Sequence, residues 1–287
     1  MTGMKQRTIG TVEVGAIGLG EMPLSVDDRP DEARAHAVIH AALDCGVTLI
    51  DTADAYCLGA ADFGHGETLV AGALQAYGGS DDILVATKGG HTRTDHEWGR
   101  DGRPEYLKRA AQDSLRRLGG DAIGLYQFHR PDTKVPYEES IGALRELLDA
   151  GTIRMAGISN ADVAQIEIAH EILGDDLVSV QNEFSPDFRS SEDELRRCGE
   201  LGLAFLPWSP LGGMSAAGGL GERHAAFAEI AEAHGISPQR LCLAWMLAKG
   251  DHVVPIPGSS RPETIRDSAA AADLQLSPDD LARLDAA

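Results

Sequence analysis

Short apolar runs alternate with longer amphipathic stretches along the whole chain. An apolar run of roughly 4–8 residues is typical of a strand buried in a parallel sheet, and the intervening stretches have the length of helices. This alternation predicts repeated strand–helix units in which helices cover a parallel sheet. The sequence contains eight such runs, at residues 16–20, 47–51, 83–88, 123–129, 154–159, 177–181, 204–208 and 253–257.

Two of the intervening stretches show helical periodicity clearly, at residues 31–44 and 140–149. Their recurring apolar side chains are Ala35, Val38, Ile39, Ala42 and Leu43 in the first stretch and Ile141, Leu144, Leu147 and Leu148 in the second. A glycine follows four of the expected helices and can end each helix in the left-handed conformation; these are Gly46, Gly119, Gly151 and Gly202. Eight strands separated by helices predict a closed (β/α)8 TIM barrel rather than an open sheet.

The first segment of the chain has a different pattern. Residues 7–14 read as a small β-hairpin around Gly10-Thr11, which we expect to close the bottom of the barrel. No Pro- or Ser-rich linker and no shift in composition divides the sequence. We therefore predict a single domain over residues 1–287.

Charge and composition narrow the possible partners. The formal net charge is −20, from 45 Asp and Glu against 25 Lys and Arg, and a field of this sign repels nucleic acid and anionic lipid. No run approaches the ~20 apolar residues of a membrane span, residues 1–10 carry no apolar signal segment, and the four cysteines form no C-x-x-C pair. These features predict a cytoplasmic protein without nucleic-acid or membrane partners, whose partner is a small molecule. Whether it is a monomer or a homo-oligomer stays open.

Candidate chemistry gathers where three successive runs end. Asp51, Lys88 and His129 lie at those ends, and Tyr56 lies in the loop after Asp51. In a parallel barrel the C-terminal strand ends meet at one mouth, where reactive residues lie. A phenol has a pKa of about 10, which a neighbouring ammonium lowers. We expect Lys88 to act in this way on Tyr56 and Asp51 to keep Lys88 charged, while His129 donates a hydrogen bond to an oxygen that gains negative charge.

Three segments resemble the aldo-keto reductase family: residues 51–56 (DTADAY), 86–88 (ATK) and 127–132 (QFHRPD), the last in the form common in the bacterial and potassium-channel β-subunit-like branch. The resemblance extends over residues 8–273. It implies an NAD(P)H-dependent oxidoreductase that reduces aldehydes or ketones to alcohols, or catalyses the reverse, by hydride transfer with Tyr56 as general acid or base. No metal is implied, and the histidines show no metal-ligand spacing.

The expected cofactor site lies late in the chain. No G-x-G-x-x-G follows the first run, whereas barrels often bind phosphate after strands 7 and 8. Two segments there, 208–213 (WSPLGG) and 256–263 (IPGSSRPE), resemble the cofactor loops of the family. The resemblance implies NADPH bound by Glu21, Met22, Ser159, Asn160, Gln181, Trp208, Ser209, Pro210, Leu211, Gly212, Gly258, Ser259, Ser260, Arg261, Asp267 and Ser268.

Within this set, the resemblance places Trp208 on the nicotinamide ring, and Ser159, Asn160 and Gln181 on its amide. The guanidinium of Arg261 would meet the 2′-phosphate, although an ordinary βα turn with a capping serine is the alternative interpretation of its loop. The chain departs from many family members at positions 208, 258, 264 and 267–268, where it has Trp, Gly, Thr and Asp-Ser. These departures leave use of NAD open.

The polar segment 89–103, which includes His96, is expected to form a lid or specificity loop, with a plain surface loop as the alternative. Met22, Phe63 and Trp98 are the expected substrate-pocket residues. The chain stops soon after a helix start at 277–280, so it lacks the long tail of steroid-reducing relatives, and we expect an open site of broad specificity. Two other functions stay open: an NADPH-binding redox-sensing or regulatory module with little turnover, and a non-redox barrel enzyme.

Overall fold

The computed structural model describes residues 3–79, 82–95 and 97–287, so His96 lies outside the described residues. One parallel sheet forms its centre. In spatial order its strands are β11 (Ala204–Phe205), β10 (Leu177–Gln181), β9 (Ile153–Ser159), β8 (Ile123–Phe128), β5 (Leu84–Gly89), β4 (Leu49–Asp51) and β3 (Leu19–Gly20). They correspond to seven of the eight predicted runs.

The eighth run closes the barrel without forming a regular strand. The amide of Val254 donates to the carbonyl of Phe205 beside β11 (2.9 Å), and the carbonyls of Pro255 and Pro257 accept from Gly18 (2.9 Å) and Gly20 (3.0 Å) beside β3. The two prolines supply carbonyls but no N–H donors on the β3 side, which leaves half of that ladder unmade. The predicted TIM barrel is confirmed, with this irregular closure as its seam.

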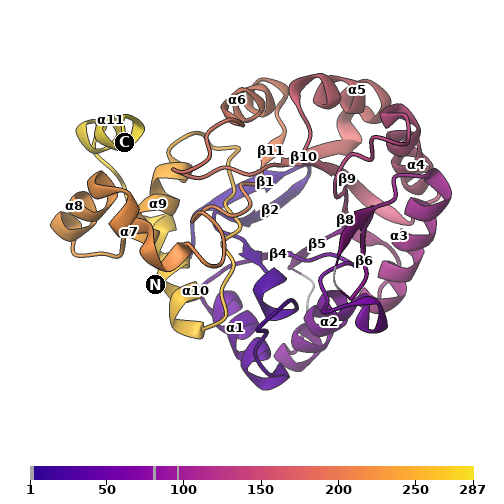
Figure 1. Cartoon of the computed structure of the whole chain (residues 1–287), viewed down its shortest axis with the longest axis horizontal. Helices are drawn as coiled ribbons and strands as arrows, with labels where there is room; N and C mark the ends of the chain where they lie inside the picture. Colours follow the sequence, from indigo (N-terminus) through magenta and orange to yellow (C-terminus); the bar gives the residue numbers. More distant parts are fainter. Residues whose placement is uncertain (1–2, 80–81, 96) are drawn as a thin grey trace.

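Helices surround the sheet as the alternation predicts (Figure 1). In the described part of the chain they are α1 (Glu32–Asp44), α2 (His65–Tyr77), α3 (Pro104–Leu118), α4 (Tyr137–Asp149), α5 (Val163–Leu173), α6 (Glu192–Leu201), α7 (Leu220–Arg223), α8 (Ala225–His234), α9 (Pro238–Leu247), α10 (Pro262–Ala269) and α11 (Pro278–Asp285), with short 3-10 turns η1 (Met22–Leu24), η2 (Ala60–Asp62), η3 (Gly174–Asp176), η4 (Ala217–Gly219) and η5 (Ala270–Asp273). In Figure 1, α7, α8 and α11 form a lobe outside α9 at one edge of the ring.

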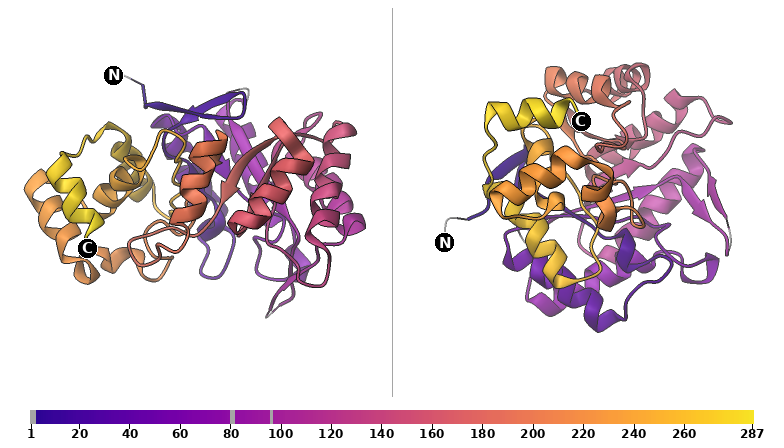
Figure 2. Two further views of the ribbon diagram at one scale, coloured as in Figure 1. Left: turned by 90° about the horizontal axis from the view of Figure 1, so that it is seen from above. Right: turned by 60° about the vertical axis from the view of Figure 1, so that its left-hand side comes forward.

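The predicted N-terminal hairpin is present. Strands β1 (Gln6–Ile9) and β2 (Val12–Gly15) pair antiparallel with Ile9 opposite Val12. Ile9 and Val14 are fully buried against the apolar side chains that fill the barrel, among them Leu49 and Leu125. Figure 2 shows the hairpin across the end of the barrel that is opposite to the mouth, and it closes that end.

The helix-ending glycines all have positive φ, with values of 85°, 78°, 70° and 72° at Gly46, Gly119, Gly151 and Gly202. Gly202 is left-handed as predicted, whereas Gly119, with ψ −178°, is not. Helix α4 begins at Tyr137, three residues before the predicted start at residue 140, because Pro136 sits at its N-cap and the polar first turn hides the periodicity. The expected loop over residues 89–103 contains a hairpin, in which β6 (His91–Arg93) pairs antiparallel with β7 (Trp98–Arg100). This hairpin projects on the side of the mouth (Figure 2).

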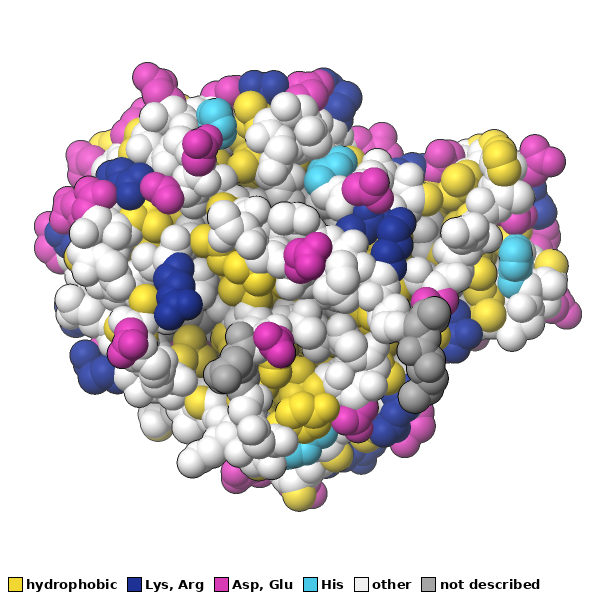
Figure 3. Space-filling view, turned by 180° about the vertical axis from the view of Figure 1, so that it is seen from behind, with side chains coloured by type: hydrophobic (Ala, Val, Ile, Leu, Met, Phe, Trp, Pro, Cys, Tyr) yellow, Lys and Arg dark blue, Asp and Glu magenta, His cyan; other side chains and the backbone are white. Residues whose placement is uncertain are grey.

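Acidic and basic side chains are interspersed around the periphery of the face seen in Figure 3. The described helices include none with the length and hydropathy that crossing a bilayer requires. On the face seen in Figure 3, the carboxylates therefore lie among basic side chains rather than forming one acidic patch.

Candidate active site

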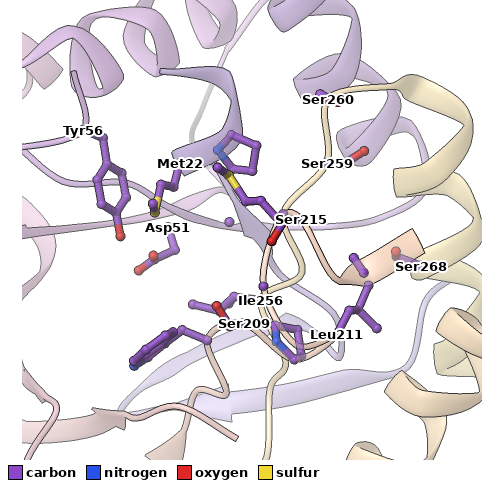
Figure 4. Close-up of a pocket in the computed structure, with 18 of the residues that line it drawn as sticks. Met22, Asp51, Tyr56, Ser209, Leu211, Ser215, Ile256, Ser259, Ser260 and Ser268 are labelled. Atoms are coloured by element: carbon purple, nitrogen blue, oxygen red, sulfur yellow. The ribbon is translucent and has the colours of Figure 1, made fainter. Parts of the chain in front are cut away.

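A cavity of about 1220 Å³ opens at the C-terminal ends of the barrel strands. Asp51 enters its wall from the end of β4, Ser159 from the end of β9 and Gln181 from the end of β10. Figure 4 shows Tyr56, Asp51 and Met22 on one side of this space and Ser259 and Ser268 on the other. The volume exceeds the ~300–1,000 Å³ of ordinary drug-sized pockets, so the cavity can hold a dinucleotide together with a small substrate.

The predicted group of titratable residues is assembled at one end of this cavity. The Nζ atom of Lys88 lies 3.2 Å from the hydroxyl of Tyr56, 2.5 Å from Oδ1 of Asp51 and 2.8 Å from the carbonyl of Thr52. Lys88 is fully buried, and Asp51 and Tyr56 are 2% and 8% exposed. The ammonium is therefore held by a charge and two further acceptors, as a buried cation requires.

A pair of glutamine amides fixes the carboxylate behind Lys88. The Nε2 atoms of Gln127 and Gln181 donate to Oδ2 of Asp51 at 3.2 and 2.8 Å, which leaves Oδ1 for the ammonium. The sequence-based prediction missed Gln127. Alternation along the strand was the available signal, because Gln127 precedes His129 by two residues and therefore points to the same side of β8.

Electrostatics at Tyr56 correct one expectation. Burial raises the pKa of the Tyr56 phenol above its ordinary value of 10.0, and the Lys88 ammonium, which favours the phenolate, offsets only part of this rise. The predicted lowering by Lys88 is therefore present, but burial, which the sequence does not reveal, outweighs it and leaves the pKa above its ordinary value. Burial alone would lower the pKa of Lys88, but the neighbouring Asp51 and Tyr56 raise it, so the residue stays charged. At neutral pH the site holds a protonated phenol beside an ammonium.

His129 stands next to Tyr56, with ring centroids 5.7 Å apart in an edge-on arrangement. Burial lowers the pKa of His129 well below 6.5, and the neighbouring His91 and Lys88 lower it further. His91 packs perpendicular to His129 at 4.3 Å, and its Nδ1 donates to the carbonyl of Gly99 at 2.9 Å. His129 is thus a neutral imidazole, which can donate one hydrogen bond into the cavity but carries no charge.

Most of the residues predicted to bind the cofactor line the same cavity. They are Met22, Ser159, Asn160, Gln181, Trp208, Ser209, Pro210, Leu211, Gly258, Ser259, Ser260, Arg261, Asp267 and Ser268, together with the predicted substrate residue Trp98. Two of them have uncommon backbone conformations, since Asn160 has φ 58° and Ser209 has φ 48°. Strained non-glycine backbone of this kind clusters at functional sites.

Four predicted site residues are not part of the cavity wall. Lys88 is bonded to Asp51 and Tyr56, which do line the cavity, but is itself fully buried behind them. Glu21 is fully buried, and its carboxylate bonds to the hydroxyls of Ser25 and Thr52. Gly212 lies against Asp187 and Arg223, which a Cβ there would meet, and its amide donates to the carbonyl of Ser209. Phe63 also lies outside the lining. It follows the turn η2, whose Asp62 carboxylate accepts hydrogen bonds from Arg29 and from the amide of Gly59.

Several lining side chains are already engaged by the protein. The Asn160 amide donates to the carbonyl of His129 (3.0 Å), and the Ser159 hydroxyl donates to the carbonyl of Gln181 (2.7 Å). Asp267, expected near adenine, forms an ion pair with Arg240 (2.7 Å) that ties α10 to α9. The wall also contains residues outside the predicted set of site residues, some of them within the predicted segments, namely Gly20, Pro23, His91, Arg100, Arg130, Gly213, Met214, Ser215, Ala217, Gly218, Ser237, Gln239, Ile256, Glu263 and Thr264.

The buried Glu21 leads to a prediction about stability. Burial raises the pKa of its carboxyl to about 7, against the lowering effect of the bonds from Ser25 and Thr52. The folded state therefore binds this proton more tightly than the unfolded state does, so the stabilisation is complete below pH 4.5 and is lost as the pH rises through 7. We expect Glu21→Gln to reduce the pH-dependent loss of unfolding free energy between pH 5 and pH 8 by on the order of 3 kcal/mol, measured by urea denaturation.

Glu13→Gln, at an exposed position of β2, is the matched control and should keep the wild-type loss. If Glu21→Gln lost the same free energy as the wild-type protein over this pH range, Glu21 would be ionised in the folded state.

The barrel and the Tyr56–Lys88–Asp51 group at its mouth define a class of α/β-barrel oxidoreductase, and comparison with known proteins agrees. The profile of the Aldo/keto reductase family matches residues 16–287. An uncharacterized oxidoreductase of Schizosaccharomyces pombe is 33% identical over 282 residues, which cover 96% of this chain and 88% of that protein. The chain therefore belongs to the aldo/keto reductase family.

Two solved structures show the same architecture. An aldo/keto reductase from Klebsiella pneumoniae in complex with NADP and acetate has a TM-score of 0.81 at 28% identity, covering 99% of this chain and 95% of that one. The glycerol dehydrogenase AKR11B4 of Gluconobacter oxydans has a TM-score of 0.82 at 26% identity, covering 98% of this chain and 94% of that one. Both similarities extend over nearly the whole barrel.

Proposed function

We propose that this protein is an NADPH-dependent reductase of aldehydes or ketones, able to catalyse the reverse reaction, in which Tyr56 transfers the proton. The observation that carries the proposal is the 3.2 Å contact between the Tyr56 hydroxyl and a fully buried, Asp51-paired Lys88 at the end of a cavity large enough for a dinucleotide. The NADP complex of the Klebsiella pneumoniae relative supports the choice of cofactor.

The residues present fit such a cofactor. The wall offers the ring of Trp208, whose buried indole N–H has no hydrogen-bond partner in the described residues, and backbone bent at Ser209 for close approach. Gly258 is needed near Pro23, because a Cβ there would lie 2.6 Å from the proline ring. Arg261 precedes α10 and carries the positive charge that a 2′-phosphate requires.

When bound, NADPH supplies the hydride. The protein's own residues supply the proton and stabilise the charge. Tyr56, protonated at neutral pH, donates its proton to the carbonyl oxygen, and the adjacent Lys88 ammonium stabilises the phenolate that remains. Asp51, held by two amides, keeps Lys88 charged and in place. Neutral His129 donates a hydrogen bond to the same oxygen.

The proposal is tested by following the absorbance of NADPH and NADH with a panel of aldehydes, ketones and sugars. Turnover of at least one carbonyl class with NADPH supports it. Tight NADPH binding without turnover of any compound would favour a redox-sensing or regulatory module instead, and failure to bind either nicotinamide cofactor would favour a non-redox enzyme. Membership of the potassium-channel β-subunit-like branch rests on residues 127–132 and stays a prediction.

The role of Arg261 can be measured by binding. Arg261→Ala should raise the Kd for NADPH on the order of 10- to 100-fold and change that for NADH little, because only NADPH carries the 2′-phosphate that a charge-assisted hydrogen bond would hold. Fluorescence titration of both cofactors gives the two ratios.

Arg266→Ala removes the same charge from an exposed position one turn along α10, outside the cavity wall, and should leave both affinities as they are. Equal weakening of NADPH and NADH by Arg261→Ala would remove Arg261 from this role.

A further inference from the structure

Three arginines line the cavity: Arg100, Arg130 and Arg261. Although the chain has 45 acidic residues, the described structure pairs none of these three guanidiniums with a carboxylate. Most other arginines of the described residues do form ion pairs; for example, Arg93 on the same hairpin as Arg100 pairs with Asp27, which lies before α1. All three arginines of the cavity therefore lack a carboxylate partner in the described structure, as do a minority of the arginines elsewhere, such as Arg109 and Arg154.

Arg130 follows His129 directly and is half-buried. Its Nη2 donates to Oδ1 of Asn160 at 2.8 Å, whereas its buried Nε has no hydrogen-bond partner in the described residues. A guanidinium carries five N–H donors in a planar fork that matches an anionic group. This side chain is thus fixed by a neutral amide, with donor capacity left over.

Arg100 brings a second guanidinium to the same place. It lies on β7 opposite His91, and its Nη1 donates to the carbonyl of Pro131 at 3.3 Å, next to Arg130 in the chain. Burial lowers the pKa of Arg130, and the charge of Arg100 lowers it further, while Glu183 opposes both effects without forming an ion pair in the described structure. Two like charges held close together, with incomplete compensation, form a site that an anion would stabilise.

This pair adjoins the reacting end of the cavity. His91, opposite Arg100, packs on His129 at 4.3 Å, and His129 packs on Tyr56 at 5.7 Å. Arg261 instead lies just before α10, in another part of the wall. Ser259 in the preceding loop and Ser268 on α10 mark this part, which lies across the cavity from Tyr56 (Figure 4). The cavity therefore has two separate positive regions, one of which lies beside the proton donor.

We propose that Arg100 and Arg130 form a subsite for an anionic group of the substrate, so that the protein selects carbonyl compounds carrying a carboxylate or phosphate. The inference rests on the proposed reductase function and narrows its substrate class. It differs from the sequence-based expectation of an open site of broad specificity. In a chain of net charge −20, such a subsite also offsets the repulsion that an anionic substrate would otherwise meet.

The test compares kcat/KM for 4-carboxybenzaldehyde with that for its neutral analogue 4-carbamoylbenzaldehyde, with 4-formylphenyl phosphate as a second anion. The wild-type protein should prefer the anions on the order of 10- to 100-fold, as expected for charge-assisted hydrogen bonds. Arg130→Gln and Arg100→Gln should each reduce that preference several-fold, and added salt should reduce it in the wild type. A higher kcat/KM for the carboxylate or for the phosphate identifies which anionic group the subsite binds.

The ratio of kcat/KM for the anionic and neutral aldehydes separates recognition of the anion from a general loss of activity. Loss of the Arg130–Asn160 bond could disturb the cavity, but it would slow the charged and neutral aldehydes alike. Arg100 is exposed, so Arg100→Gln gives a second reading that does not depend on folding. Lys134→Gln removes one charge from the loop that carries Arg130, outside the cavity wall, and should leave the ratio unchanged.

Reduction of both benzaldehydes with no preference for the anions would overturn the subsite while leaving the reductase function intact. A preference that survives Arg130→Gln together with Arg100→Gln would overturn it as well. If none of the aldehydes is reduced with NADPH or NADH, the proposed function itself fails, and the subsite with it.

Discussion

Tyr56→Phe should lower carbonyl turnover by about 10²- to 10⁴-fold, the usual contribution of general acid catalysis, while leaving NADPH binding intact. The phenyl ring keeps its packing beside His129, whereas the proton that burial holds on the hydroxyl at neutral pH is gone. Steady-state kinetics on the best aldehyde of the panel, with fluorescence titration of NADPH, measures both quantities.

Tyr137→Phe is the matched control, because the hydroxyl of this α4 residue has no hydrogen-bond partner in the described structure. It should retain wild-type turnover. Full activity of Tyr56→Phe would show that another group donates the proton, and loss of cofactor binding in that variant would show that the hydroxyl shapes the cavity rather than the reaction.

Asp51→Asn should destabilise the protein by about 3–5 kcal/mol and abolish most turnover, since it leaves a fully buried ammonium without its counter-charge. Adding Lys88→Met removes the unpaired charge. The double variant should therefore regain more than half of the lost free energy of unfolding and remain inactive. Urea denaturation and the aldehyde assay distinguish these two effects.

A surface pair provides the comparison. Glu146 and Lys108 form an exposed ion pair at 2.7 Å, and Glu146→Gln should cost less than about 1 kcal/mol because solvent screens both charges. A similarly small cost for Asp51→Asn would mean that water reaches Lys88, and a double variant less stable than Asp51→Asn would mean that Lys88 stabilises the fold by packing alone.

The electrostatics of the site favour proton donation at neutral pH. Burial keeps Tyr56 protonated and His129 neutral, and Asp51 keeps Lys88 charged. In the proposed reaction the ammonium would therefore stabilise the product of proton transfer, the phenolate, more than the resting phenol. This arrangement places the stabilising interaction where charge develops during the reaction.

The sequence predicted the barrel and the reacting group well because both depend on local order. Alternating apolar runs define strands, and residues at run ends must meet at one mouth once the strands are parallel and adjacent. Asp51, Lys88 and His129 needed no further information. The helix-ending glycines, such as Gly46 and Gly202, could also be predicted from local sequence, since a helix end with positive φ favours glycine wherever the helix lies.

Predictions that depended on the direction of a single side chain were less successful. Glu21 precedes the pocket residue Met22, yet it turns into the core, and Phe63 misses the cavity because the turn η2 is anchored by distant Arg29. The net pKa of Tyr56 depends on how many neighbours exclude water, which motif spacing does not contain.

What the sequence determined by itself is therefore the strand–helix repeat, the barrel and the residues at its mouth, all properties of periodicity and chain order. Only the tertiary structure decided that Gln127 binds Asp51, that β6 and β7 pair as a hairpin, and that Arg100 and Arg130 share one stretch of wall. The physical reason is that hydrogen bonds, burial and charge interactions join residues far apart in the chain, at distances that only the folded backbone sets.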